Sequence, residues 1–185
     1  MWTTYLATKD ADHTCWRVAE LGGAVVMGPV PAGQDGRLFL AVDPAGAPVG
    51  FWEGHHAQGV VLADEPGAVC GHELRTLDRT GADGFYGGLF GYELVRRDGV
   101  DVLELDGVDR AVLSGSGSVR PHWLPLFGAA PPQPVVARAL ALGARLTRQD
   151  AGGAAVLRDP WGARFGVVGP GPDPDGAPRS QGPHR

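Results

Sequence analysis

The sequence predicts an α+β fold built from three repeated βαβββ modules, with strands that form cupped mixed sheets. Two observations lead to this fold class. The opening of the chain is similar to a segment that begins at Trp123, and short apolar runs alternate with turn-forming residues. The 30 glycines and 16 prolines among the 185 residues fall between these runs and in the C-terminal tail, a distribution typical of many short strands joined by tight turns.

The internal repeat relates two stretches that share one order of Trp, Arg, Leu-Gly and Asp-Pro-x-Gly-Ala. The matching pairs are Trp2 and Trp123, Arg17 and Arg138, Leu21 and Leu142, and Asp43 and Asp159. Because the order holds over the whole of each copy, we expect each copy to form the same structural unit.

The first module is expected to span residues 1–53. A strand over 3–7 leads into a helix from about Asp10 to Leu21, which Asp10 or Asp12 can cap and which the Leu-Gly pair ends. Strands over 24–27, 37–42 and 49–52 follow. The Asp-Pro-x-Gly sequence that starts at Asp43 supplies the hairpin turn between the last two.

The copy that begins at Trp123 repeats this order. A divergent module lies between the two copies, where Asp78 caps a helix that ends at Gly91 and two Asp-Gly pairs mark hairpins. We therefore expect four regions in the chain. They are the unpaired first module (1–53, half of a two-module domain), a linker (54–69), a complete two-module domain (70–168) and a disordered tail (169–185).

Composition excludes several classes of partner. The formal net charge of −5 gives no basic surface for nucleic acid or an anionic membrane, and no apolar run reaches the roughly 18 residues that span a bilayer. With no signal-like start and only Cys15 and Cys70, the chain is expected to be cytoplasmic with reduced thiols. Neither a phosphate-binding glycine loop after a strand nor a Ser-His-Asp arrangement in a familiar context is present.

Two kinds of motif carry a family resemblance. The string ELxTxDxxxAxxFYxxLFG at Glu73–Gly91 and the DPxGAxxG hairpins at Asp43 and Asp159 resemble the vicinal oxygen chelate (VOC) superfamily of glyoxalase and bleomycin-resistance proteins. They are more closely similar to a tandem actinobacterial type with four modules. The resemblance covers Trp2 to Val168. It implies a cupped fold that hosts isomerases, epimerases, dioxygenases, transferases and binding proteins, so it leaves the reaction open.

The module count departs from the family pattern. Modules of this family pair to close a cup, and the first module has no partner within the chain. An unpaired module would expose an apolar sheet face and a free strand edge. We therefore expect a homodimer through the first module; the alternative is a chain that lacks one N-terminal module.

The resemblance also implies a divalent metal held by His, Gln or Glu on first strands and Glu on last strands. The last-strand positions correspond to Gly50 and Gly166, and the first-strand positions to Thr3, Gly71 and Leu124. His72 is one residue out of register, so strand alternation turns it away from the cup. Glu73 remains as one possible oxygen ligand, and we expect no metal and no cofactor.

Six residues are candidates for a site. Glu73 and Arg75 share the inward face and can act as base and electrostatic clamp, or form only a structural ion pair. The candidate ligand-binding residues are Trp52, Trp123, Leu124 and Arg164. Trp123 can stack on a planar ligand or fill the core, and Arg164 can meet an anionic one.

The favoured function is that of a metal-free protein that binds a small organic molecule in its cup. The alternative is a VOC-family lyase, isomerase or cyclase that acts on a small metabolite. In that alternative Glu73 is the base, or a metal is held by ligands that this alignment misplaces.

Overall fold

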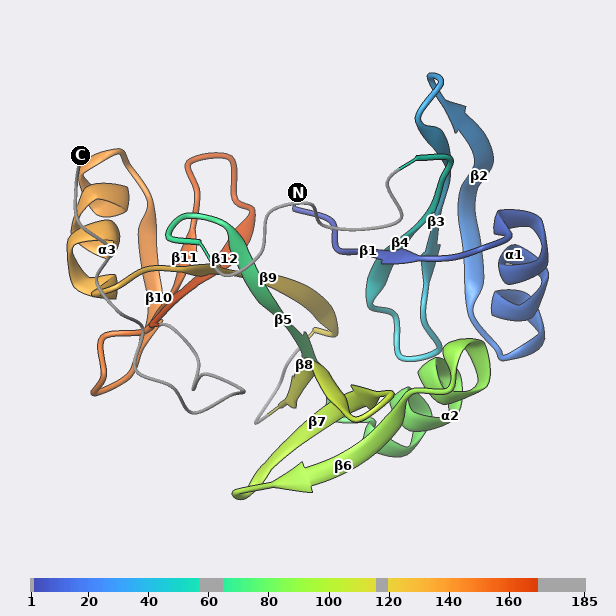
Figure 1. The fold of residues 1–185 in the computed structure, drawn as a ribbon. Helices are drawn as coiled ribbons and strands as arrows, with labels where there is room; N and C mark the ends of the chain where they lie inside the picture. The colour runs from blue at the N-terminus through green and yellow to red at the C-terminus, as the bar shows by residue number, and fades with distance from the viewer. Residues whose placement is uncertain (1, 57–64, 116–119, 170–185) are drawn as a thin grey trace.

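The structure is a computed structural model that describes residues 2–56, 65–115 and 120–169. Three stretches of the chain have the same order of elements (Figure 1). The first unit contains β1 (Tyr5–Ala7), α1 (Ala11–Glu20), β2 (Ala24–Ala32), β3 (Gly36–Val42) and β4 (Pro48–Gly54). The second contains β5 (Val69–Arg75), α2 (Arg79–Phe90), β6 (Glu93–Arg97), β7 (Val100–Leu105) and β8 (Val108–Ser114). The third contains β9 (His122–Gly128), α3 (Pro132–Ala141), β10 (Arg145–Gln149), β11 (Ala155–Arg158) and β12 (Arg164–Val168).

The strands form two mixed sheets. The first unit makes a four-stranded sheet in the order β1-β4-β3-β2, and the other two units share an eight-stranded sheet in the order β10-β11-β12-β9-β5-β8-β7-β6. The first strands of the second and third units, β5 and β9, pair antiparallel at the centre of the larger sheet. Within each unit the first strand runs parallel to the last. The predicted fold class is confirmed.

Local sequence signals account for the ends of the elements. Asp10 caps α1 and Asp78 caps α2, each through a carboxylate oxygen that accepts a backbone N–H at 2.8 Å. At the hairpin between β6 and β7, Asp98 and Gly99 have φ angles of 51° and 81°, as a tight turn of mirror-image type requires. These caps and the Asp-Gly turns lie where the sequence predicts them.

Two local expectations need correction. β2 extends to Ala32, well beyond the predicted end at Met27, because two register irregularities let the strand continue past Gly28-Pro29. Trp2 does not share the burial of its repeat partner Trp123: it is 47% exposed and meets Phe127 and Phe165 edge-on. The predicted linker and tail fall partly outside the described residues, which omit 57–64 and 170–185.

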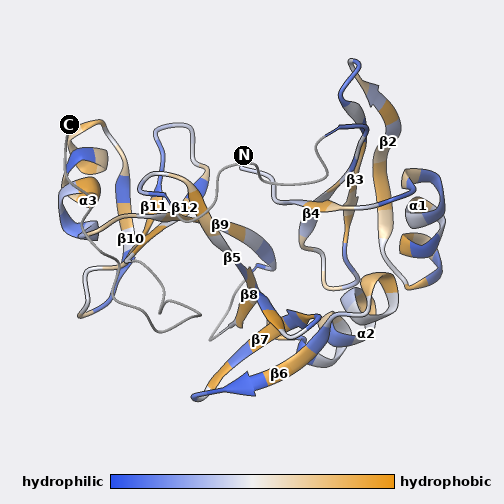
Figure 2. Cartoon of the chain, in the orientation of Figure 1, coloured by the Kyte–Doolittle hydropathy of each residue, from blue (hydrophilic) through white to orange (hydrophobic). Residues whose placement is uncertain are grey.

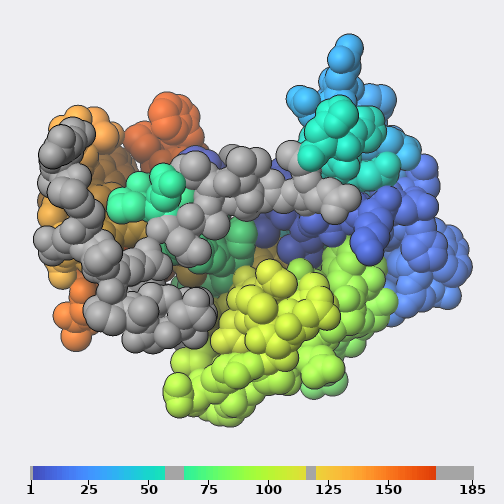
Figure 3. Space-filling model, in the orientation of Figure 1, coloured from blue at the N-terminus to red at the C-terminus, as the bar shows by residue number. Residues whose placement is uncertain are grey.

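The first unit packs against the second through α2. In Figure 1, α2 lies between β6 and the first sheet, and in Figure 3 the green atoms of this region abut the blue atoms of the first unit. Phe85 of α2 packs beside Val18 of α1 in one core that also holds the stacked rings of Phe39 and Phe51. Hydrophilic and hydrophobic residues both occur along α1 (Figure 2), and its buried residues Ala11, Thr14 and Val18 recur three or four positions apart, which gives the helix one buried face.

A buried polar chain crosses the same junction. The Tyr86 hydroxyl donates to Asp43 Oδ2 at 3.0 Å and accepts from the Trp123 indole at 2.9 Å. Burial raises the pKa of the Asp43 carboxyl, against the hydrogen bonds from Ala47 N–H and Tyr86 that lower it. Burial likewise raises the pKa of Tyr86 well above its usual value. These bonds connect the Asp-Pro turn of the first unit with α2 and β9.

Among the residues that the structure describes, none of the helices has the length and apolar character that crossing a bilayer would require.

Candidate functional site

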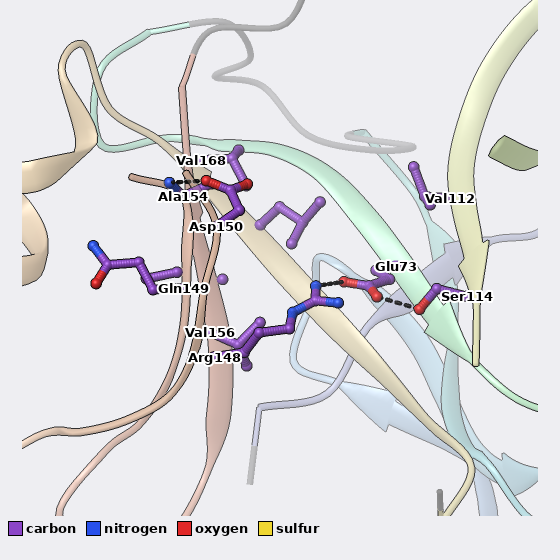
Figure 4. Close-up of a pocket in the computed structure, with 12 residues that line it drawn as sticks. Glu73, Val112, Ser114, Arg148, Gln149, Asp150, Ala154, Val156 and Val168 are labelled. Atoms are coloured by element: carbon purple, nitrogen blue, oxygen red, sulfur yellow. Dashed lines mark hydrogen bonds and ion pairs between the residues drawn. The ribbon is translucent and has the colours of Figure 1, made fainter. Parts of the chain in front are cut away.

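A cavity of about 340 Å³ opens on the concave side of the eight-stranded sheet. Strands from the second and third units supply its walls, so neither unit forms it alone (Figure 4). Its lining is mostly apolar with a charged group at one end. The lining residues are Glu73, Val112, Ser114, Leu126, Arg148, Gln149, Asp150, Ala154, Ala155, Val156, Gly166 and Val168.

Glu73 lies at the centre of the sheet, where β5 pairs with β8 on one side and β9 on the other. Its carboxylate is buried. Ser114 Oγ donates a hydrogen bond to Glu73 Oε1, and Arg75 Nε lies 3.7 Å from the same oxygen. Arg148 Nη2 approaches Glu73 Oε2 to 3.6 Å from the opposite wall (Figure 4). One carboxylate is thus shared by a hydroxyl and two guanidinium groups.

A second cavity of about 300 Å³ lies on the other side of this cluster. Arg75 lines it, while Ser114, Val112 and Arg148 line both cavities. The two cavities therefore adjoin at Val112, Ser114 and Arg148, with Glu73 lining the first cavity and Arg75 the second.

His122 is the cross-strand neighbour of Arg75 on the concave face. Its Nδ1 lies 2.8 Å from the Arg120 carbonyl oxygen, and its Nε2 is buried without a hydrogen-bond partner among the described residues. Burial lowers the pKa of His122, and the charges of Arg164 and Arg75 act in the same direction. The imidazole is therefore held neutral at neutral pH.

The positions at which this kind of cup can hold a metal carry few donor atoms. A Cβ at Gly166 would lie 2.5 Å from Leu126 Cδ2, and a Cβ at Gly50 would lie 2.5 Å from the Tyr5 ring. In the first and third units, a side chain from the first strand thus fills the place of a last-strand ligand. The cross-strand neighbour of Glu73 is Leu124, and the described residues hold no cluster of three or more His, Cys, Asp or Glu suited to a metal. These residues do not fit a chelated metal ion.

The structure brings Glu73 and Arg75 together, with Leu124 beside Glu73 on the neighbouring strand, and places the other predicted site residues outside both cavity linings. Trp52 lies on the first sheet, paired with Leu38, outside both cavity linings. Trp123 is buried on the opposite face of β9, where it bonds to Tyr86.

Leu124 and Arg164 are also absent from the cavity linings. Leu124 is fully buried beneath the cup. Arg164 is exposed at the start of β12, close enough to His122 to influence its pKa. His72 faces away from Glu73 by strand alternation and contacts the Trp123 ring edge-on, as predicted.

Sequence reasoning missed Ser114, Arg148 and the role of His122. Alternation along β8 and β9 would have placed Ser114 and His122 on the inward face. Arg148 was hidden because the ladder between β10 and β11 shifts register between Leu146 and Arg148, which changes the face that the strand presents.

Comparison with known proteins gives a consistent picture. A family model described as a glyoxalase-like domain matches residues 73–168. The anthracycline biosynthesis protein DauV of Streptomyces sp. (strain C5) is 34% identical over 179 residues, which cover 91% of this chain and 65% of DauV. The chain thus spans somewhat less than two thirds of the length of that relative.

Two solved structures have a similar fold. The Mn(II)-bound glyoxalase from Novosphingobium aromaticivorans matches with a TM-score of 0.56 at 16% identity, over 89% of this chain and 60% of its own. The homoprotocatechuate 2,3-dioxygenase from Brevibacterium fuscum, in complex with 3,4-dihydroxyphenylacetate, matches with a TM-score of 0.57 at 16% identity, over 94% of this chain and 63% of its own. At this identity the likeness concerns the fold.

Proposed function

The chain belongs to the glyoxalase-like family of the VOC superfamily, and on that premise we propose that it binds a small organic molecule in the cup of the eight-stranded sheet without a metal. The observation that carries the proposal is a cavity in which Leu126 fills the place of a last-strand ligand while the space beside Glu73 stays open. A volume of about 340 Å³ lies within the usual range of ligand pockets.

Thermal stabilisation is the direct test of binding, because a ligand that binds only the folded state raises its melting temperature. The name of DauV makes aromatic polyketides and their smaller phenolic analogues the first probes. Ala154→Trp would place an indole in the cavity and should abolish the shift, whereas Ala137→Trp on the exposed side of α3 should leave it unchanged. Equal shifts in both variants would contradict binding in this cup.

Elemental analysis tests the metal-free part of the proposal. We expect purified protein to contain less than about one tenth of an equivalent of Ni, Zn, Mn or Fe, because a single carboxylate without further donors does not retain a divalent ion. Stoichiometric metal that Glu73→Gln removes would overturn this part.

A second candidate is an enzyme of the same family, a lyase, isomerase or cyclase that uses Glu73 as base. The position of a buried carboxylate at the wall of a cavity favours it, since such a group can accept a proton from a bound molecule. Glu73→Gln distinguishes the two candidates. A binding protein shows no turnover before the change and keeps its ligand affinity within a few-fold after it, whereas an enzyme keeps binding its substrate but loses turnover. Arg75 is the accompanying clamp in this alternative.

We further propose that a second copy of the chain covers the first sheet. β1 is an edge strand with β4 as its one neighbour, although its counterparts β5 and β9 pair with each other. Tyr5, Met27 and Val30 expose 42%, 40% and 38% of their surface on that sheet. The alternative from the sequence, a chain that lacks one module, leaves the same surface open.

Light scattering at micromolar concentration tests this pairing. We expect a dimer that Met27→Lys dissociates and that Val135→Lys, an exposed apolar residue on α3, leaves intact. A well-behaved monomer would contradict it. The cytoplasm remains our proposed location, supported by the low cysteine content of the chain.

A further inference from the structure

Around Glu73, where the two cavities adjoin, the described residues present more hydrogen-bond donors than acceptors. Glu73 Oε1 already accepts from Ser114, and the guanidinium atoms of Arg75 and Arg148 stop 3.7 and 3.6 Å from the carboxylate. Charge-assisted hydrogen bonds of this kind are normally about 2.7–2.9 Å long. Both arginines are therefore attracted to Glu73 without a hydrogen bond to it.

Of the two arginines, Arg75 is the more deeply buried. Its side chain is 16% exposed, and its Nε is buried with no hydrogen-bond acceptor among the described residues. Buried guanidinium N–H groups are almost always paired, so an unpaired one points to an acceptor that comes from outside the protein. Arg75 lines the second cavity, and Arg148 lines both cavities.

The other acidic groups of the two linings do not supply that acceptor. Asp101 is engaged by Arg79 and Arg96. Asp150 accepts the Ala154 backbone N–H at 2.9 Å at the far end of the first cavity. With Asp101 and Asp150 occupied elsewhere, Arg75 and Arg148 have the one carboxylate of Glu73 near them among the described residues, so two positive charges lie beside one negative charge.

We propose that the molecule bound in this cup carries a carboxylate whose oxygens accept hydrogen bonds from Arg75 and Arg148, while its apolar body packs on Val112, Leu126 and Val156. A planar carboxylate suits this position because a guanidinium group presents its N–H donors as a fork. The inference rests on the proposed binding function and adds the chemical class of the ligand.

Isothermal titration with acid and amide pairs tests it, with benzoate against benzamide and naphthoate against naphthamide as probes. The members of each pair have nearly the same shape and differ in charge. In the unmodified protein we expect the acid to bind about tenfold more tightly than its amide, as a charged hydrogen bond predicts.

Arg148→Gln should remove most of that preference and leave amide binding within about twofold. Arg145→Gln is the matched control, because Arg145 lies on the same strand and outside both cavity linings. Arg75→Lys keeps the charge of the buried residue and loses the fork, so it should weaken acid binding without unfolding the protein.

The outcomes separate the two proposals. Equal affinity for acid and amide, with both lost in Ala154→Trp, overturns the carboxylate and leaves the binding function intact. An acid preference that Arg145→Gln reduces as much as Arg148→Gln also overturns it, since the effect would then come from general surface charge. If none of the acids binds while a neutral aromatic compound does, the carboxylate is again refuted; if no compound binds, both proposals fail.

Discussion

Replacing Tyr86 with Phe should reveal how firmly the first unit is attached to the rest of the chain. The hydroxyl that this change removes is fully buried and accepts from the Trp123 indole at 2.9 Å while it donates to Asp43 at 3.0 Å. The ring itself stays, so its edge-on contacts with Phe85 and Trp123 are preserved. The substitution therefore isolates the polar chain from the apolar packing.

The expected cost follows from the two groups left behind. The indole N–H and one oxygen of the Asp43 carboxylate would be buried without their partner, at about 1–3 kcal/mol for each such group. Asp43 keeps the Ala47 N–H at 2.7 Å on its other oxygen, which limits the loss. We expect the free energy of unfolding to fall by about 3 kcal/mol. For a chain of this size that lowers the melting temperature by about 6–12 °C.

Urea denaturation followed by tryptophan fluorescence measures the change, with Tyr92→Phe as the matched control. Tyr92 is half-buried at the end of α2, and its hydroxyl takes part in no hydrogen bond among the described residues. We expect the control to change the free energy of unfolding by less than about 0.5 kcal/mol. Because one apolar core contains residues of the first and second units in either variant, both variants should unfold in one transition.

The loss should also depend on pH. Burial raises the folded-state pKa of Asp43, and the hydrogen bond from Tyr86 opposes that rise, so the pKa should climb further in Tyr86→Phe. A raised carboxyl pKa means that the folded state binds more protons than the unfolded state, which lowers the free energy of unfolding at neutral pH. This destabilisation becomes smaller as pH falls toward the carboxyl pKa of the unfolded state. The deficit should therefore be smaller at pH 4.5 than at pH 7. A deficit below about 0.5 kcal/mol at pH 7, or one equal to that of Tyr92→Phe, would refute the reasoning.

Three further predictions concern single positions. Gly166→Ala should lower stability by about 1–3 kcal/mol, because its new methyl group would meet Leu126 Cδ2 at 2.5 Å, and adding Leu126→Ala should recover part of the loss in a double-mutant cycle. Burial lowers the pKa of His72, so the unfolded state binds more protons below pH 6.5 and stability should fall between pH 7 and 5. His72→Asn should flatten that slope in urea titrations at stepped pH, and an unchanged slope would count against the burial effect. Asp78→Ala should cost about 1 kcal/mol through the lost N-cap of α2, recoverable by Asp78→Ser, and an equal loss in both variants would argue against capping.

Much of the fold could be read from local signals. Asp78 and Gly91 define the ends of α2, and the Asp-Gly pairs define two hairpins, because caps and tight turns depend on backbone angles that few residues adopt. Alternation along one strand was enough to place Glu73 and Arg75 on the same face and to turn His72 away. Strand parity follows from the pleat of the backbone, so it holds along a stretch without a register shift, such as Glu73–Arg75.

The site could be predicted only in part. Glu73 and Arg75 come from one strand. Ser114 comes from β8, which the sheet order places beside β5, and Arg148 comes from β10 at the sheet edge, which reaches Glu73 across the cup. The shift in the ladder of β10 decides which way Arg148 points, and nothing local to its sequence announces that irregularity. The burial of Trp123 against Tyr86 also could not be read from the sequence, because it depends on where α2 packs.

The sequence by itself determined the three βαβββ units, the turns between their strands and the inward face of β5, since these follow from backbone geometry and side-chain alternation. Tertiary structure alone decided that Leu126 fills the position beside Gly166, that Arg148 crosses the cup to Glu73, and that Tyr86 ties the two sheets together. The physical reason is the distance along the sequence between the residues that interact. Turns and strand faces are set by neighbours along the chain. Which side chains share a cavity depends instead on strand order, register and packing between residues far apart in sequence.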